Sequence, residues 1–291
     1  MKNCTLLVLS CDKYSDAWIP FFTLLKRYWG GSIENLKIVL MAESKQFSFD
    51  GLNIKTFPTD KKEFWSERLL RYLDLIDTDF VMLACEDSFL RKKNDPDRIQ
   101  KFISYMENNP DISNINLQGI DEDDLLSREQ DNRFPELDKR PHGADYCFNT
   151  GGLWRVSHLK NYLIPKESPW DFETTGNFWS KFTKNTFYVE KKGNYSCWPI
   201  NWTTEWMGIC RGKWVYEDVV PLFEKEGIVV DLNRLGTYHR PIAKSKEKKP
   251  SLRKKISKII RNGTLKKAKL FKLNVSAYFQ VLRKKMRNEW S

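Results

Sequence analysis

The stretch Thr78–Leu90 constrains the fold more than any other part of the sequence. It contains a continuous apolar run, Phe80–Cys85, which is too short for a helix and is bounded by polar residues. Such a run is typical of a strand that is buried on both faces of a sheet. It ends at Glu86 and Asp87, and carboxylates after a buried strand are costly unless they face a cleft, a cation or a donor. Because ligands of open α/β sheets bind outside the carboxyl ends of the strands, we expect this strand to deliver two carboxylates to the floor of a site.

The residues before this strand alternate between strand and helix patterns. We expect strands at Cys4–Ser10, Leu36–Met41 and Ile54–Phe57, a helix capped by Ser15 or Asp16 that runs through Tyr28, and an amphipathic helix at Glu63–Ile76. This order predicts an α/β fold, with a Rossmann-like, mostly parallel central sheet flanked by helices.

The second half of the chain has weaker patterns. The expected helices are Asp97–Asn108, Val156–Leu163, a helix opened by Ser168 and Pro169, and Glu217–Lys225. The expected strands or extended segments are Ser113–Leu117, Thr186–Val189, Cys197–Trp202 and Val229–Leu232. The expected loops are Gly119–Arg140, Gly208–Gly212 and Gly236–Pro241. In the block Tyr146–Arg155, Gly151 and Gly152 permit a tight turn or close approach of the backbone to a ligand.

The net charge of +11 is unevenly distributed. Residues 242–291 contain 17 Lys or Arg and 2 Asp or Glu, a net +15, whereas residues 1–241 contain 32 and 36, a net −4. The basic segment has apolar and aromatic residues at helical spacing, a pattern that favours a helical tail lying on an anionic membrane surface. Packing on its own domain or in an oligomer is the alternative. We expect no nucleic-acid partner, because the aromatic residues do not interleave with the basic ones and the body has no basic groove.

Three features concern the location of the protein. No apolar run reaches about 18 residues, so we expect no membrane-spanning helix. The apolar start of the chain lacks the small-residue cleavage site of a signal peptide and favours a first strand. The six cysteines include no C-x-x-C pair, which favours free thiols. We therefore expect a cytoplasmic protein that is peripheral at the inner face of the cytoplasmic membrane.

A nucleotide needs a slot for its base, carboxylates for ribose hydroxyls and a cation for phosphates. Residues of these kinds follow the expected strands or lie on the helix before Phe80–Cys85, so a doubly wound sheet would bring them together. They are Ser10, Cys11, Asp12, Glu43, Trp65, Arg68, Glu86 and Asp87. Arg68 could equally form a salt bridge on the helix surface, and Glu43 could equally be a loop carboxylate that binds no ligand.

Four short motifs, taken in order, resemble the GT-A class of nucleotide-sugar-dependent glycosyltransferases, especially bacterial enzymes of surface polysaccharide (lipopolysaccharide or capsule) assembly. They are Leu7–Tyr14, Glu86–Phe89, Asn149–Arg155 and Ser168–Glu173. The resemblance covers residues 1–241 and implies a GT-A-like domain there. About 1–118 would be the nucleotide-sugar-binding half and 119–241 the acceptor and catalytic half, with 242–291 as the basic tail.

In that class an Asp-x-Asp or Glu-Asp-Asp motif ends the central strand and holds Mn²⁺ or Mg²⁺ on the diphosphate. Here Cys85-Glu86-Asp87 lacks the first Asp, and Glu86-Asp87-Ser88 lacks the last. The resemblance implies Asp87 and a late histidine, His239, as metal ligands. In metal-independent members Lys or Arg neutralise the leaving diphosphate instead, and the candidates here are Arg68, Arg155, Arg211, Lys213 and Arg240.

The resemblance also implies a transfer that needs a general base. A carboxylate deprotonates the acceptor hydroxyl in an inverting transfer, and Asp171 and Glu173 in the first turn of a helix are the candidates. Asn149 and the backbone of Gly151 and Gly152 are candidates for holding donor-sugar hydroxyls.

The expected function is transfer of a sugar from a nucleotide-diphosphate sugar, with UDP-sugars favoured, to a lipid-linked or oligosaccharide acceptor in cell-surface polysaccharide synthesis. One alternative is a nucleotidyltransferase on a related fold, which would be expected to have a glycine-rich, phosphate-binding loop after the first strand. The other is a non-catalytic carbohydrate-binding or scaffold protein.

Overall fold

The structure is a computed structural model that describes residues 1–60, 62–117, 129–143, 147–191, 198 and 208–240. The chain divides into two compact units, Met1–His239 and Arg240–Ser291. The first unit carries the elements described below, and the expected tail helix lies outside the described residues.

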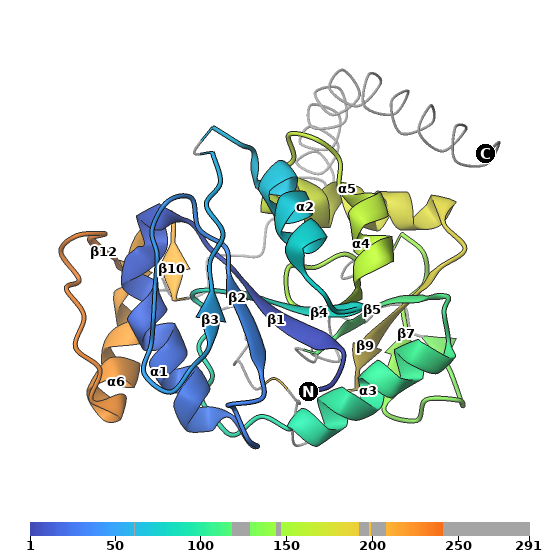
Figure 1. Cartoon of the computed structure of the whole chain (residues 1–291), viewed down its shortest axis with the longest axis horizontal. Helices are drawn as coiled ribbons and strands as arrows, with labels where there is room; N and C mark the ends of the chain where they lie inside the picture. The colour runs from blue at the N-terminus through green and yellow to red at the C-terminus, as the bar shows by residue number, and fades with distance from the viewer. Residues whose placement is uncertain (61, 118–128, 144–146, 192–197, 199–207, 241–291) are drawn as a thin grey trace, which may run out of the picture. The chain divides into compact units, whose positions relative to one another are not determined.

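Nine of the described strands form one sheet, in the order β3-β2-β1-β4-β8-β5-β9-β7-β6 (Figure 1). The strands are β1 Cys4–Leu9, β2 Lys37–Leu40, β3 Ile54–Lys55, β4 Phe80–Cys85, β5 Ile112–Asn116, β6 Glu129–Gln130, β7 Leu137–Lys139, β8 Gly152–Arg155 and β9 Thr186–Glu190. The helices are α1 Trp18–Tyr28, α2 Trp65–Leu75, α3 Pro96–Asn108, α4 Val156–Tyr162, α5 Pro169–Trp179 and α6 Tyr216–Glu226, with 3₁₀ turns η1 Asp12–Ala17 and η3 Ser180–Phe182.

The expected α/β class is confirmed, and the strand directions refine it. Strands β3, β2, β1 and β4 run parallel to one another. Strand β8 lies between β4 and β5 and is antiparallel to both, whereas β9 is parallel to β5 and β7 is antiparallel to β9. The sheet is therefore parallel in its first half and mixed beyond β4.

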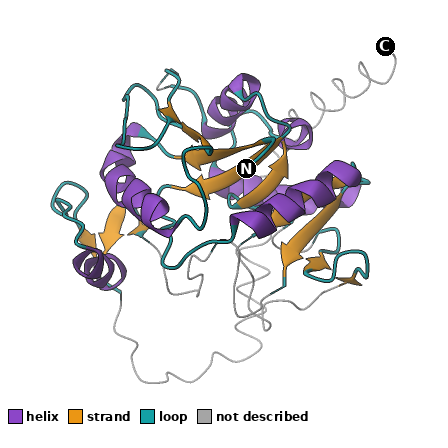
Figure 2. Ribbon diagram, turned by 60° about the horizontal axis from the view of Figure 1, so that its bottom comes forward, coloured by secondary structure: helices purple, strands orange, loops and turns teal. Residues whose placement is uncertain are grey.

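Helices cover both faces of the sheet (Figure 2). Because side chains alternate along a strand, Leu6 and Val8 of β1 pack in a cluster with α1, α3 and α6, whereas Leu7 and Leu9 pack in a second cluster with α2, α4 and α5. Strand β4 divides in the same way. This burial on both sides explains why the central strands read as continuous apolar runs.

Local capping sets some of the helix boundaries. The expected cap by Ser15 or Asp16 is wrong, because both residues lie within η1 and α1 has no side-chain cap at its start. The Asp95 side chain accepts a hydrogen bond from Arg98 N (3.0 Å) and Pro96 begins α3, so both stabilise its first turn. The expected start of α5 is confirmed, since Asp171 N donates to Ser168 Oγ (3.2 Å). Helix α6 ends at Gly227, whose φ of 64° is the left-handed conformation that closes many helices.

Several expectations for the second half are wrong. The expected strand Val229–Leu232 is not a strand, and Val229 is 94% exposed, without the sheet neighbour a strand needs. The expected loops at Gly208–Gly212 and Gly236–Pro241 contain β10 Ile209–Cys210 and β12 Thr237–Tyr238, which form a small sheet with β11 Lys213–Val215. These strands, like β6 and β7 within Gly119–Arg140, are too short to show a periodic pattern. Cys197–Trp202 lies outside the described residues except for Trp198.

Within the described part of the chain, no helix combines the length and apolar character needed to cross a bilayer. The five cysteines that the structure describes are all free.

Candidate functional site

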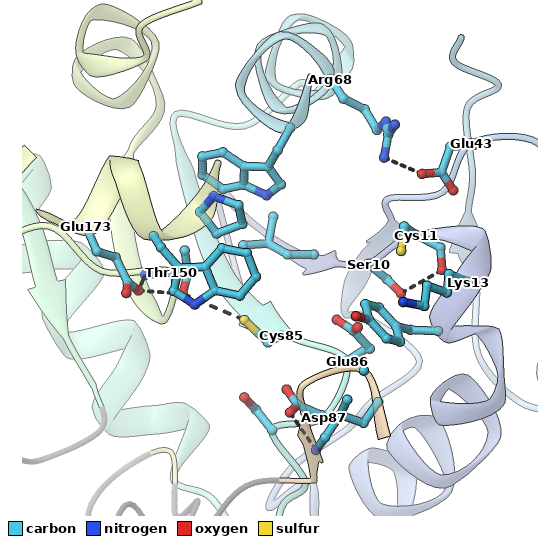
Figure 3. Close-up of a pocket in the computed structure, with 18 of the residues that line it drawn as sticks. Ser10, Cys11, Lys13, Glu43, Arg68, Cys85, Glu86, Asp87, Thr150 and Glu173 are labelled. Atoms are coloured by element: carbon cyan, nitrogen blue, oxygen red, sulfur yellow. Dashed lines mark hydrogen bonds and ion pairs between the residues drawn. The ribbon is translucent and has the colours of Figure 1, made fainter. Parts of the chain in front are cut away.

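A cavity of about 790 Å³ opens beyond the carboxyl ends of β1 and β4 (Figure 3). Its walls come from the segments after β1, β2 and β4, the turn before β8, helices α2 and α5, and the β10–β11 hairpin. The residues that line it are Leu9, Ser10, Cys11, Lys13, Tyr14, Glu43, Trp65, Arg68, Cys85, Glu86, Asp87, Ser88, Thr150, Pro169, Trp170, Glu173, Ile209, Arg211 and Gly212. The structure thus joins segments that are about 200 positions apart in sequence.

Glu86 and Asp87 lie at the end of β4 and line this cavity. Glu86 is 9% exposed, and the Asp87 carboxylate accepts a hydrogen bond from Ile209 N (3.0 Å). No cation among the described residues forms an ion pair with either carboxylate. Burial raises the pKa of Glu86 well above its usual range, and the neighbouring Asp87 raises it further, while burial also raises the pKa of Asp87. The pair is therefore an uncompensated acidic group in front of a hollow, and a cation arriving there would favour its charged form.

A second charged pair, Glu43 and Arg68, joins the end of β2 to α2. Arg68 Nη1 lies 2.6 Å from Glu43 Oε1, and the two side chains are only 7% and 13% exposed. Arg68 Nη2 also donates to Glu63 O (3.3 Å), while the buried Nε has no partner among the described groups. The positive charge of Arg68 is therefore largely neutralised inside the protein, although one of its donors remains available.

Asp12 does not line the cavity. Its carboxylate accepts hydrogen bonds from the Ser44 hydroxyl (2.6 Å) and from the backbone N–H groups of Glu43, Ser44 and Lys45. Partial burial opposes ionisation of Asp12, but these donors prevail and lower its pKa to about 2. Asp12 thus ties the loop after β1 to the loop after β2 and supports the wall that Ser10, Cys11 and Glu43 form.

The Asp-x-Glu pair at the start of α5 divides between two roles. Glu173 lines the cavity, and its Oε1 accepts hydrogen bonds from Thr150 N (2.9 Å) and Thr150 Oγ1 (2.7 Å), as Figure 3 shows. Asp171 is exposed, and its Oδ2 accepts from Ser168 N (3.1 Å) and Ser168 Oγ (2.6 Å). Asp171 therefore stabilises the first turn of α5, and Glu173 is the one that the fold directs to the site.

Asn149, Gly151 and Gly152 are not among the lining residues. Asn149 Nδ2 donates to Asn114 Oδ1 (3.0 Å), and Gly151 N donates to Asn149 Oδ1 (3.2 Å). A Cβ added to Gly152 would lie 2.7 Å from Ile115 O, so this glycine allows β8 to approach β5. These residues build the turn that carries Thr150, and the close approach predicted for the glycines is to the neighbouring strand.

Arg155 lies at the other end of β8, opposite Phe80 at the start of β4. Its guanidinium donates to the carbonyls of Ile112 (3.2 Å) and Asn109 (3.3 Å). The antiparallel direction of β8 causes this, because it carries residue 155 to the opposite edge of the sheet from residue 152.

The structure does not bring His239 together with Asp87. His239 Nδ1 lies 3.0 Å from Glu217 Oε1 at the start of α6. Within the described residues, no group of three or more His, Cys, Asp or Glu side chains could hold a metal ion. Glu86 and Asp87 fit a Mg²⁺ or Mn²⁺ ion only if diphosphate oxygens and waters complete its coordination, which is how proteins commonly hold Mg²⁺.

Lys13 and Thr150 line the cavity but were not chosen from the sequence as ligand-binding residues, whereas Arg211, which also lines it, was one of several cations expected from the resemblance to neutralise a diphosphate. Lys13 directly follows the predicted Ser10–Asp12 segment. The pair Arg211-Gly212 between short apolar pieces is a weak signal for a two-residue hairpin.

No model of a known protein family and no curated protein matches this chain. Similar solved structures include *S. aureus* TarS 1–349 in complex with UDP-GlcNAc, which is 12% identical over 66% of this chain and 59% of that one, with a TM-score of 0.40. A cytidylyltransferase from *Leptospira borgpetersenii* is 11% identical over 67% of this chain and 78% of that one, with a TM-score of 0.42. UTP-bound UGPase from *Acinetobacter baumannii* is 10% identical over 68% and 89%, with a TM-score of 0.39.

Two of these structures contain a nucleotide sugar or a nucleotide, UDP-GlcNAc in TarS and UTP in the UGPase. The chain spans about three fifths of the TarS structure. Likenesses this weak assign no reaction, so the function below is inferred from the residues of the cavity.

Proposed function

We propose that this protein is a glycosyltransferase that moves a sugar from a nucleotide-diphosphate sugar, with UDP-sugars favoured, to a lipid-linked or oligosaccharide acceptor in cell-surface polysaccharide synthesis. The observation that carries the proposal is one cavity lined both by the uncompensated pair Glu86 and Asp87 and by the held carboxylate of Glu173. The acidic pair can hold a divalent cation on the diphosphate of a donor, and the carboxylate of Glu173 can activate an acceptor hydroxyl.

In this proposal the nucleoside binds near the wall formed by Ser10, Cys11 and Trp65, which offers polar groups and an aromatic face. The Trp65 ring packs 5.6 Å from that of Phe172 in α5, so the two helices that flank the cavity support each other. Glu43 and Arg68 keep the end of β2 against α2 and so fix the shape of this wall.

Glu173 is the general base of the proposed reaction. Its carboxylate takes the proton of an acceptor hydroxyl, whose oxygen attacks the anomeric carbon of the donor sugar as the bond to the diphosphate breaks. Attack on the face opposite the leaving group inverts the configuration. Trp170, which lines the cavity and is 75% exposed, offers a flat face for the acceptor sugar.

If a divalent ion accompanies the donor, Glu86 and Asp87 are the residues that would hold it, and the ion would neutralise charge on the departing diphosphate. The acidic pair would otherwise repel a diphosphate. The proposed reaction therefore takes one of two forms. Either Mn²⁺ or Mg²⁺ neutralises the diphosphate, or protein cations do so.

Incubation with labelled nucleotide sugars and a panel of lipid-linked and oligosaccharide acceptors, with and without Mn²⁺, tests this function. We expect acceptor-dependent release of nucleoside diphosphate. Binding without turnover would favour the carbohydrate-binding alternative. Release of pyrophosphate from a nucleoside triphosphate and a sugar phosphate would favour a nucleotidyltransferase, although Ser10–Tyr14 contains no glycine and leads into η1.

The hydrogen bonds from Thr150 make a separate prediction. Thr150→Val removes the hydroxyl donor to Glu173 but keeps the backbone donor and the side-chain shape. Since a hydrogen bond to a charged group contributes about 1.5–3 kcal/mol, we expect kcat for transfer to fall about tenfold or more. Thr150→Ser retains the hydroxyl and should stay within about threefold of the wild type. Equal rates for the Val and Ser variants would contradict this positioning role.

The proposal also keeps the expected location at the inner face of the cytoplasmic membrane. The strong excess of Lys and Arg in residues 242–291 supports it, because basic amphipathic segments bind anionic lipid surfaces. Such a location would bring the cavity to lipid-linked acceptors.

A further inference from the structure

We propose that Lys13 and Arg211 form the binding site for the two phosphates of the donor, an assignment that rests on the proposed function above. Both residues line the cavity that contains Glu86 and Asp87. Lys13 comes from η1 directly after β1, and Arg211 comes from the hairpin between β10 and β11, so the two cations reach the cavity from distant parts of the chain.

The backbone at Arg211 is unusual for a residue with a side chain. Arg211 has φ 54° and Gly212 has φ 78°, and together they form the two-residue turn between β10 and β11. Turns with positive φ at both positions favour Asn-Gly or Gly-Gly, because a larger side chain is disfavoured in the left-handed region. An arginine kept in this conformation at the edge of a cavity indicates a role for its side chain, since strained residues concentrate at functional sites.

Lys13 lies against the same turn. A Cβ built on Gly212 would be 3.1 Å from Lys13 Nζ and 3.6 Å from Tyr14 Oη. The ammonium group therefore lies close to the residue that follows Arg211. Gly212 permits both the turn and this approach.

Neither cation is neutralised by the described protein. No described carboxylate forms an ion pair with Lys13 or Arg211, although acidic residues line the same cavity. Each cation instead lies over an aromatic ring: Lys13 Nζ is 5.2 Å from the centre of the Tyr14 ring, and the Arg211 guanidinium is 5.8 Å from that of Tyr238. Two cations that line one cavity and form no ion pair with its carboxylates favour an anionic ligand with more than one charge.

The position of the hairpin is fixed by the acidic pair itself. Ile209 N donates to Asp87 Oδ2 (3.0 Å), and a Cβ on Gly208 would lie 2.8 Å from Asp87 O. The turn that carries Arg211 is thus attached to the end of β4. This arrangement places protein cations and carboxylates around one cavity, so that the cations can bind the phosphate oxygens of a ligand while the carboxylates face a metal ion or remain neutral.

The two cations differ in what they offer a diphosphate. The planar guanidinium of Arg211 can bind two phosphate oxygens at once, whereas the ammonium of Lys13 acts as a compact charge. When the sugar leaves, negative charge grows on the diphosphate, and both cations stabilise it. A ligand with two phosphates should therefore depend on this site more strongly than one with a single phosphate.

The test compares Lys13→Met, Arg211→Met and the double variant with wild type by isothermal titration calorimetry. The probes are inorganic pyrophosphate, UDP, UMP and uridine, with and without Mn²⁺. Lys213→Met is the matched control. Lys213 was also expected from the resemblance to neutralise a diphosphate, but it is an exposed cation on the same hairpin that does not line the cavity. Thermal unfolding verifies that each variant is folded, and Arg211→Lys provides a second variant at the turn.

We expect each single variant to weaken pyrophosphate and UDP about tenfold or more, and the double variant about a hundredfold. UMP should be affected less, uridine should be unaffected, and Lys213→Met should remain within about twofold of wild type. Wild-type protein that binds neither pyrophosphate nor UDP would overturn the proposal. The proposal would also be overturned if the double variant bound these ligands as tightly as wild type. It would be overturned as well if Lys213→Met lost as much affinity as the variants of Lys13 and Arg211.

The failure of this site and the failure of the proposed reaction are distinguishable. If wild type binds UDP through Lys13 and Arg211 but transfers no sugar, the phosphate site stands and the glycosyltransferase proposal does not. If wild type transfers sugar and the double variant binds UDP as tightly, the reaction stands and the phosphate site is elsewhere.

Discussion

Glu173→Gln is expected to lower the rate of sugar transfer by about 10²–10⁴-fold, the range that a general base commonly contributes. Glutamine keeps the size of the side chain and can still accept hydrogen bonds from Thr150, but it cannot take a proton from an acceptor hydroxyl. The affinity for the nucleotide should change by less than about threefold, because Glu173 is not one of the residues proposed to hold the nucleoside or the diphosphate. Steady-state kinetics of transfer and calorimetric titration with UDP measure the two effects.

Asp171→Asn is the matched control for this prediction. Asp171 is two residues away on the same helix, but its carboxylate binds Ser168 and it does not line the cavity. We expect turnover within about threefold of wild type and a loss of stability of about 1 kcal/mol from the weakened helix start. If Asp171→Asn abolished transfer and Glu173→Gln did not, the assignment of the base would be wrong.

Gly152→Ala should cause the largest loss of stability among the changes considered, about 2–5 kcal/mol in the free energy of unfolding. The residue has φ 110°, and a Cβ there would lie 2.7 Å from Ile115 O and 3.0 Å from Asn116 Cα. Both atoms belong to the backbone of β5, so no side chain can move aside to accept a methyl group. Urea denaturation followed by circular dichroism gives the change.

Gly227→Ala separates this steric effect from the cost of backbone conformation alone. Gly227 also has positive φ, 64°, but nothing lies within 4 Å of where its Cβ would be. We expect it to lose only about 1 kcal/mol, the cost of the left-handed conformation. Similar losses for the two variants would mean that β8 and β5 can separate to admit a methyl group and that the close contact is not decisive.

The first half of the fold could be predicted because its strands are buried on both faces. Runs such as Phe80–Cys85 are continuous and apolar, and the helices between them have an apolar stripe, so the order of elements is readable. The carboxylates at the end of β4 stood out for the same reason, because polar residues that interrupt a buried strand are conspicuous.

The second half could not be predicted to the same degree, and the reason is the short length of its elements. Strands of two or three residues, such as β10 and β12, have no period to detect. The direction of β8 is not visible in its sequence either, and it is this direction that separates Arg155 from the cavity. Lys13 is a charged loop residue like many others until the fold brings it beside the turn that carries Arg211.

The same applies to Asp171 and Glu173. From the sequence they are equivalent carboxylates in the first turn of one helix. The helix geometry turns them about 200° apart around the axis, at 3.6 residues per turn. Only the packing of α5 decides which of the two faces the interior of the site.

The bond between Asp87 and Ile209 links residues that are 122 positions apart. A polypeptide emerging from the ribosome completes β4 long before it supplies the hairpin that closes this wall, and contacts between such distant segments form slowly. In a newly made chain, Asp87 therefore lacks the hydrogen bond from Ile209 until this hairpin has been synthesised. The proposed phosphate site is therefore complete only in a unit that includes the β10–β11 hairpin.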